Sequence, residues 1–195
     1  MKIFDIYETR DVKVEDPGLK RYINLQEKLV LKSHGRAKSK FEKGKVNIIE
    51  RLANLIAVPG HRGKKHKIIT GRASGKYSKN MKIVLDCLRM IQEKTGKNPI
   101  QILVNAIENA SPRDEITVIE YGGARYPQAV DVSPLRRVNL TLRNIVHGAY
   151  DKSFNKKTKI GEALAQEILL ASQGNMESFS MSKKNESEKQ ADSAR

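Results

Sequence analysis

Apolar residues recur every three or four positions in several stretches of the chain, which is the spacing of one face of an α-helix. Between 47 and 58, the first such stripe contains Ile48, Leu52 and Leu55, and Asn47 is placed to cap its start. The same spacing predicts further helices over 79–95, from 98 to the Ser111-Pro112 pair, from 133 past 146, and over 160–172.

Several residues are placed to start or end these helices. Glu50 occupies the position of a capping-box acid in the first helix, which Pro59-Gly60 is expected to end. Gly96 is placed to end the second helix and Gly174 the fifth. Asn98 is placed to cap the third helix, and Pro99 begins it, at a position where its missing N–H does no harm.

The hydrophobic period changes from 3.6 to 2 near 116, and this region is expected to form a β-hairpin. Ile116 and Val118 alternate with Thr117 and Ile119, and a second β-rich run follows Gly122-Gly123 and extends to 132. Two such runs around a Gly-Gly pair are typical of a tight hairpin. Because no other clear strands occur, we expect the hairpin to project from a helical body.

The length of 195 residues favours one domain over 1–195. We expect a mainly α fold, a helical bundle of five to six helices with a protruding β-hairpin. The N-terminal part, 1–45, is expected to be a basic extension, irregular or strand-like to about residue 32, with a turn at Asp16-Pro17-Gly18. Its segment 34–45 has little to bury and is expected to order only against a partner. The C-terminal part, 175–195, is polar and is expected to be a flexible tail or a marginal helix.

The formal net charge is +15, and the whole excess lies in one third of the chain. Between Lys20 and Lys82 there are 18 Lys or Arg against the three acids Glu27, Glu42 and Glu50, whereas the rest of the chain holds 19 basic and 19 acidic residues. A block of one sign is typical of a surface that binds a polyanion. A merely solvated basic surface remains the alternative at this point.

Neither a membrane span nor export is indicated. No apolar run reaches about 18 residues, and the beginning of the chain has no apolar signal region. The lone cysteine, Cys87, lies beside the apolar face of 79–95 and is expected to be a small buried hydrophobic residue. We therefore expect the reducing cytoplasm as the compartment.

The motifs of catalysis and metal binding are not matched. The stretch GRASGKY at 71–77 has three residues between its glycines and Tyr after its Lys, so it departs from the P-loop pattern. His61 and His66 lack nearby further ligands for a metal. The side chains of the adjacent acids Asp114 and Glu115 would point to opposite faces of a strand, so they cannot easily act together on one substrate. We expect no enzyme, no catalytic residues, no metal and no cofactor.

Nucleic acid fits the basic residues better, because Lys and Arg neutralise phosphates. The candidate nucleic-acid-binding residues, which are the candidate contacts with RNA, are Arg36, Lys38, Lys40, Lys43, Lys45, Arg62, Lys64, Lys65, Lys67, Lys76, Lys79, Lys82, Arg136, Arg137 and Arg143. The candidate single-strand contacts at the hairpin tip are Tyr121, Gly122, Gly123, Arg125 and Tyr126. Two alternatives stay open: Arg136 and Arg137 could pair with local acids, and the hairpin tip could have a packing role.

Long passages resemble one known family. These are DPGLKRYINL at 16–25, NIIERL at 47–52, EKTGKNPIQILVNAIENASPRDE at 93–115, YGGARYPQAVDVSPLRRVNL at 121–140 and SAR at 193–195. The chain resembles the family of the seventh small-subunit ribosomal protein in its archaeal form. The resemblance implies a helical domain with an extended hairpin that binds the 3′ major domain of small-subunit rRNA and helps nucleate assembly of the head.

The resemblance also implies the neighbours of each part. The basic loops and the start of the Arg136-Arg137 helix would contact an RNA junction. The hairpin would lie near the exit-site tRNA and the messenger RNA path. The C-terminal helix would reach toward the platform and the eleventh ribosomal protein, and other head proteins would be neighbours. The alternative is a helical DNA-binding protein, which the charge permits, although no convincing helix–turn–helix pair with a basic recognition helix is found.

Overall fold

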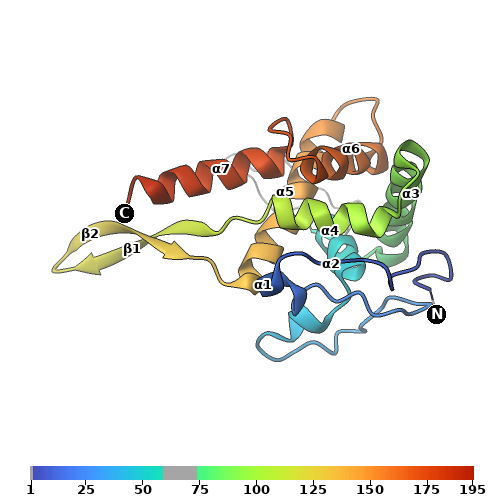
Figure 1. The fold of residues 1–195 in the computed structure, drawn as a ribbon, viewed down its shortest axis with the longest axis horizontal. Helices are drawn as coiled ribbons and strands as arrows, with labels where there is room; N and C mark the ends of the chain where they lie inside the picture. Colours follow the sequence, from blue (N-terminus) through green and yellow to red (C-terminus); the bar gives the residue numbers. More distant parts are fainter. Residues whose placement is uncertain (1, 59–73) are drawn as a thin grey trace.

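The structure, a computed structural model, describes residues 2–58 and 74–195, which form a helical body with one two-stranded sheet (Figure 1). In chain order the elements are α1 (Pro17–Lys20), the 3-10 helix η1 (Glu42–Lys45), α2 (Ile48–Ala57), α3 (Tyr77–Thr95), α4 (Pro99–Asn109), β1 (Asp114–Tyr121), β2 (Ala124–Asp131), α5 (Pro134–Ser153), α6 (Ile160–Ser172) and α7 (Phe179–Asp192). The predicted mainly α fold with a hairpin is confirmed.

The hydrophobic core lies between α4, α5 and α6, and α2 and α3 close it on the side away from the hairpin. Leu103 and Ile107 of α4 and Leu164 and Ile168 of α6 are completely buried. Each such side chain contributes about 1.5–3 kcal/mol by leaving water. Cys87 is also completely buried, as predicted from its place beside the apolar stripe of α3.

The caps that the sequence predicts are present. The side chains of Asn47 and Asn98 each accept a hydrogen bond at 3.0 Å, from the N–H groups of Ile49 and Ile100, respectively. Gly96 ends α3 in the left-handed conformation with φ 67°. The expected termination of α2 by Pro59-Gly60 lies outside the described residues.

The predicted capping box at Glu50 is not formed. The Glu50 carboxylate instead accepts a hydrogen bond of 2.7 Å from the N–H of Ser33. The reason is tertiary, because the N-terminal segment passes close enough to α2 to offer a donor from outside the helix. Glu50 therefore anchors that segment to α2.

The hairpin has the predicted two-residue turn. Tyr121 pairs with Ala124, and Asp114 at the other end of β1 pairs with Asp131. Gly122 and Gly123 both have positive φ, 59° and 80°, which is what a tight turn of this kind requires at both central positions. The tip projects from the helical body, as expected (Figure 1).

The C-terminal segment, expected as a tail or marginal helix, forms the helix α7. Ser178 caps it, and the hydroxyl of Ser178 also donates a hydrogen bond of 2.7 Å to the buried carboxylate of Glu167 on α6. The N–H of Ser180 donates to the same carboxylate at 3.2 Å. The polar composition of α7 did not reveal this anchor, because the acceptor belongs to another helix.

Helix α7 runs beside the base of the hairpin rather than away from it (Figure 1). The Glu188 carboxylate accepts a hydrogen bond of 3.0 Å from the N–H of Arg113, and the Ser187 hydroxyl donates one of 3.1 Å to the carbonyl of Asp114. Arg195 pairs with the Asp114 carboxylate at 2.7 Å. The base of the hairpin is thus supported by α7, and only its outer part is free of the body.

The N-terminal segment contains a short helix that was not expected and a loop with internal hydrogen bonds. Asp16-Pro17-Gly18, expected as a turn, opens the single-turn helix α1, which Asp16 caps by accepting the N–H of Gly18 at 2.8 Å. Segment 34–45 has hydrogen bonds of its own, and its ordering only against a partner stays a prediction. Glu42 accepts the N–H groups of Lys38 and Ser39, both at 3.1 Å. The single acid of this segment, Glu42, therefore holds its backbone, which the composition did not predict.

Candidate nucleic-acid interface

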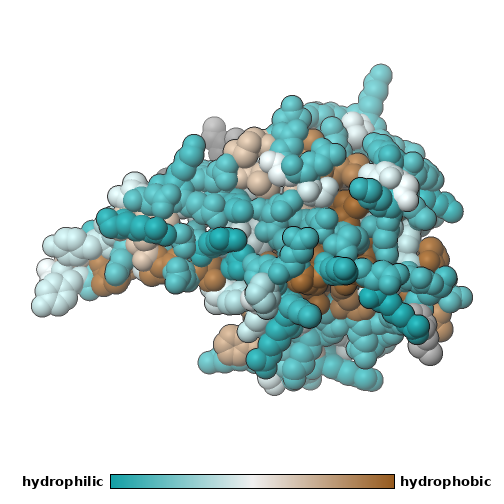
Figure 2. Space-filling model, viewed as in Figure 1, coloured by the Kyte–Doolittle hydropathy of each residue, from teal (hydrophilic) through white to brown (hydrophobic). Residues whose placement is uncertain are grey.

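The candidate rRNA-binding residues gather in three neighbouring parts of the described chain. Arg62, Lys64, Lys65 and Lys67 lie outside the described residues. The others lie on the basic segment before α2, at the start of α3 and along the first half of α5: Arg36, Lys38, Lys40, Lys43, Lys45, Lys76, Lys79, Lys82, Arg136, Arg137 and Arg143. Much of the molecular surface in view is hydrophilic (Figure 2).

The start of α3 is joined to the N-terminal segment by Tyr77. Its hydroxyl donates a short hydrogen bond to the carbonyl of Leu31, and the ammonium of Lys32 lies 5.6 Å from the centre of its ring. Burial, and next the charge of Glu50, raise the pKa of Tyr77 to about 12, so its hydroxyl remains a donor at neutral pH. Lys76 and Lys79 are therefore held near the basic N-terminal segment.

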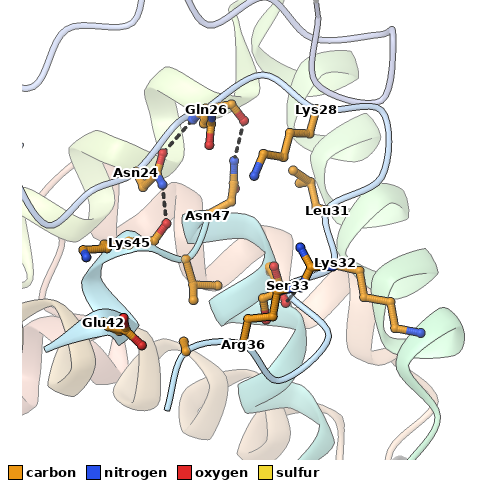
Figure 3. Close-up of a pocket in the computed structure, with 13 residues that line it drawn as sticks. Asn24, Gln26, Lys28, Leu31, Lys32, Ser33, Arg36, Glu42, Lys45 and Asn47 are labelled. Carbon is orange, nitrogen blue, oxygen red and sulfur yellow. Dashed lines mark hydrogen bonds between the residues drawn. The ribbon is translucent and has the colours of Figure 1, made fainter. Parts of the chain in front are cut away.

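The N-terminal segment forms a pocket of about 270 Å³ against the start of α2, which we call the segment pocket (Figure 3). Its cationic lining consists of Lys28, Lys32, Arg36 and Lys45. Lys28 points into the pocket, whereas Lys32 extends away from it (Figure 3). Several cationic side chains around one pocket suit the oxygens of a phosphate backbone.

Amide side chains hold the wall of the segment pocket. The side-chain oxygen of Asn24 accepts the N–H of Gln26 at 2.8 Å, and its amide donates a short hydrogen bond to the carbonyl of Lys45. Asn47 donates to the carbonyl of Gln26 at 3.0 Å (Figure 3). The two acids in the lining, Glu42 and Glu50, accept backbone N–H groups, as described above. The wall is thus built without using the cationic side chains.

A second concave surface lies between η1 and α5, and we call it the η1–α5 groove. It has a volume of about 260 Å³ and is lined by Phe41, Lys43, Leu55, Ser133, Leu135, Arg136, Asn139, Leu140 and Arg143, among which there is no carboxylate. Gly44 lets η1 pack closely against α5, because it has no side chain. A Cβ atom there would lie 3.1 Å from the Tyr22 ring and 3.5 Å from Leu135. The groove is therefore cationic and partly apolar.

Arg51 lies behind this groove and was not singled out in the sequence. It is 2% exposed and donates hydrogen bonds of 2.9 Å to the carbonyl of Tyr22 and to the side-chain oxygen of Asn139. Burial lowers the pKa of Arg51 to about 10, so it remains a cation at neutral pH. Partial burial, and then the charges of Arg51 and Arg143, lower the pKa of Lys43. These three cations therefore raise the positive potential of the groove together.

The two adjacent arginines at the start of α5 both pair with acids. Arg136 binds Glu115 of β1 through two nitrogens, at 2.7 and 2.9 Å, and its side chain remains 55% exposed. Arg137 pairs with Asp16 at 2.9 Å and is only 12% exposed. The backbone N–H groups at the start of α5 have no side-chain cap, since the Ser133 side chain makes no cap hydrogen bond. Contact of either arginine with RNA stays a prediction.

The hairpin tip carries exposed aromatic rings. Tyr121 is 82% exposed and Tyr126 is 58% exposed, and Val118 and Ile119 are exposed beside them. Among the described residues, Arg125 pairs only with Glu120 on the adjacent strand, at 3.7 Å. This arrangement leaves flat rings available for stacking on unpaired bases. A packing role for the tip within this chain has no support among the described residues.

Groups suited to catalysis or metal binding are not assembled in the described parts of the chain. There, no three His, Cys, Asp or Glu side chains lie together as metal ligands. Burial raises the pKa of the Cys87 thiol, which makes it a poor nucleophile. Within residues 2–58 and 74–195, no helix is both long and apolar enough to span a membrane.

Comparisons with known proteins agree with the resemblance. The family model described as ribosomal protein S7p/S5e matches residues 19–195. The small ribosomal subunit protein uS7 of Nanoarchaeum equitans is 48% identical over 196 residues, which cover 100% of this chain and 99% of that protein. The proteins of the same name from Thermoplasma volcanium and Methanothermobacter thermautotrophicus are 44% and 46% identical, over 99% and 98% of this chain and 100% and 98% of their own length.

Proposed function

The chain belongs to the ribosomal protein S7p/S5e family and is a non-enzymatic component of the small ribosomal subunit, within which we propose that it binds the 3′ major domain of the rRNA. This proposal places the protein in the head of the subunit, where it would help to nucleate assembly. The observation that carries it is the convergence of the basic residues on the segment pocket, the start of α3 and the η1–α5 groove.

These three surfaces suit folded RNA better than duplex DNA. Two of them, the segment pocket and the η1–α5 groove, are concave, and the groove joins segments that are distant in the sequence, whereas a DNA-reading motif would present one basic helix to the major groove. Arg and Lys at several angles can bind phosphates of strands that converge at a junction. We propose the candidate residues of the basic segment, the start of α3 and the start of α5 as the rRNA contacts, with Arg137 acting mainly through its pair with Asp16.

We propose that the hairpin and α7 contact neighbours other than the main rRNA junction. The exposed Tyr121 and Tyr126 at the tip suit contacts with the exit-site tRNA and the messenger RNA path. Helix α7 buries only a few of its side chains, among them Met181 and Ala191, so most of its surface is polar and available to a neighbour. We propose that this surface faces the platform and the eleventh ribosomal protein.

The proposal is tested by measuring the affinity of the purified full chain for an isolated transcript of the rRNA 3′ major domain. A duplex DNA of equal length serves as the competitor, and both are titrated across a range of salt concentrations. We expect the transcript to bind more tightly than the DNA. The logarithm of its binding constant should fall with the logarithm of salt, by about 0.7–0.9 for each phosphate neutralised. Equal affinity for both nucleic acids would favour the DNA-binding alternative, and a flat salt dependence would contradict both.

A further inference from the structure

Phe41 presents an aromatic ring to solvent from an unfavourable backbone conformation. The residue is 74% exposed, and its φ is 66°, in the left-handed region. That conformation costs a residue with a side chain roughly 1–2 kcal/mol, and leaving a phenyl ring in water gains nothing in return. No partner within the described chain covers the ring, so its placement is best explained by an external ligand.

The surroundings of Phe41 specify the chemistry of that ligand. Phe41 lines the η1–α5 groove together with Lys43, Asn139 and Arg143. Among the described residues, the Lys43 and Arg143 side chains form no ion pair with any acid, and the groove lining contains no carboxylate. A flat apolar surface beside two cations matches a ligand that has a flat ring and a negative charge.

Asn139 adds a hydrogen-bond donor of fixed direction. Its side-chain oxygen faces Arg51, at 2.9 Å from Nη2. An arginine can only donate, so the amide cannot be turned the other way round without losing this bond. The Asn139 amide nitrogen therefore faces away from Arg51, which itself is 2% exposed and fixed by the Tyr22 carbonyl. The groove thus offers a positioned donor as well as its cations.

We infer that the η1–α5 groove holds a single unpaired nucleotide of the rRNA, an inference that rests on the proposed function. The base stacks on the Phe41 ring, and its phosphate lies between Lys43 and Arg143. The Asn139 amide nitrogen donates to an acceptor on the same nucleotide. Stacking on an aromatic side chain tolerates any base, and an unpaired base is the form in which RNA exposes a face for stacking.

The test measures the affinity of Phe41 variants for the transcript of the 3′ major domain. We expect Phe41→Ala to weaken binding about 5- to 100-fold, as the loss of one stacked base does, and Phe41→Trp to retain wild-type affinity. Phe154→Ala is the matched control, because Phe154 is another exposed phenylalanine, 52% exposed at the other end of α5. Thermal unfolding should be similar for all variants, because the altered side chains are exposed.

Chemical probing of the transcript supplies the second measurement. One unpaired nucleotide should be protected from 2′-hydroxyl acylation by the wild type and by Phe41→Trp, and should regain reactivity with Phe41→Ala. Wild-type affinity and an unchanged footprint for Phe41→Ala would overturn the nucleotide site and leave the proposed function intact. Full affinity for Phe41→Leu would overturn it as well, because an apolar contact would then suffice without a flat ring. Failure of the wild type to bind the transcript would instead overturn the proposed function.

Discussion

The carboxylate of Glu167 on α6 accepts a hydrogen bond from the ammonium group of Lys152 on α5, with 2.7 Å between Nζ and Oε2. Its other oxygen accepts the hydroxyl of Ser178 and the N–H of Ser180 at the start of α7. Glu167 is completely buried, so these donors replace the water that the charge has lost. One carboxylate therefore joins three helices and sets the direction in which α7 leaves the body toward the hairpin.

We predict that Glu167→Ala lowers the free energy of unfolding by about 3 kcal/mol, because the Lys152 ammonium group and the buried donors at the start of α7 lose their acceptor. Denaturant titration measures the change. Gln166→Ala is the control, since Gln166 is the exposed neighbour on the same helix and its loss should change stability by less than about 0.5 kcal/mol. Equal stability of the two variants would contradict the role of Glu167.

Gly148 on α5 is predicted to tolerate no side chain. A Cβ atom there would lie 2.8 Å from both Cδ of Glu167 and Cβ of Phe179, so α5 and α7 would have to move apart. We expect Gly148→Ala to destabilise the protein by about 1–3 kcal/mol. Gly161→Ala is the matched control in α6, because its nearest neighbour would be the flexible end of Met90 at 3.5 Å. Its thermal midpoint should be unchanged or slightly higher, and a similar loss in both variants would contradict the steric argument.

The sequence predicted those elements whose signals are local. Helices α2 to α6 were found because each carries its own apolar stripe, and local signals mark several of their ends, as Asn98 and Pro99 do for the start of α4. Helix α7 was left undecided because its stability comes from the Glu167 carboxylate on another helix. Hydrophobic periodicity does not reveal contacts of this kind.

The candidate site was predicted in its residue types but not in its arrangement. The charge pattern found Lys43 and Arg143, but their meeting in one groove depends on how η1 packs against α5. Arg51 was missed because it lies in an apolar helix and looks in the sequence like an exposed charge, whereas it is 2% exposed. Phe41 was missed because the sequence does not show which aromatic residue is left in water.

The ion pair between Asp16 and Arg137 is predicted to make stability depend on pH in the acid range. Burial alone would raise the pKa of Asp16, but the hydrogen bonds from Arg137 and Gly18 and the charge of Arg137 outweigh burial and hold it below its usual value. A carboxyl whose pKa is lower in the folded state stabilises the fold above its unfolded pKa of about 3.9. That stability is lost as the pH falls through the folded pKa.

Comparison of the wild type with Asp16→Asn tests this linkage. The difference in free energy of unfolding should be largest above about pH 5 and should shrink as the pH falls below about 4. Glu15→Gln is the control, because it changes the adjacent carboxyl, which makes no ion pair among the described residues. A difference for Asp16→Asn that stays constant with pH would exclude the ionised pair as its cause.

Cys87 is predicted to be unreactive in the native protein. It is completely buried in α3, and burial raises the pKa of its thiol, so both access and thiolate formation are suppressed. Titration with a thiol reagent at pH 8 should show labelling at least about 1000-fold slower than in denaturant, because reaction requires unfolding. Rapid stoichiometric labelling without denaturant would show that α3 opens or that the thiol is accessible.

Arg143 is predicted to contribute to RNA affinity through charge, whereas its loss should leave the fold intact. It is exposed, lines the η1–α5 groove and forms no ion pair among the described residues, so removing it breaks no internal contact of its guanidinium. Arg143→Ala should weaken binding to the rRNA 3′ domain and reduce the salt slope by about 0.7–0.9, the value for one phosphate.

The control for Arg143→Ala is Lys94→Ala, which removes one exposed positive charge in the last turn of α3, at the end of the body away from the hairpin (Figure 1). The two variants have the same net charge, so a general effect of charge would lower both affinities equally. A local phosphate contact lowers only that of Arg143→Ala and changes only its salt slope. Equal slopes for the two variants would show that the groove attracts RNA at long range without binding a phosphate through Arg143.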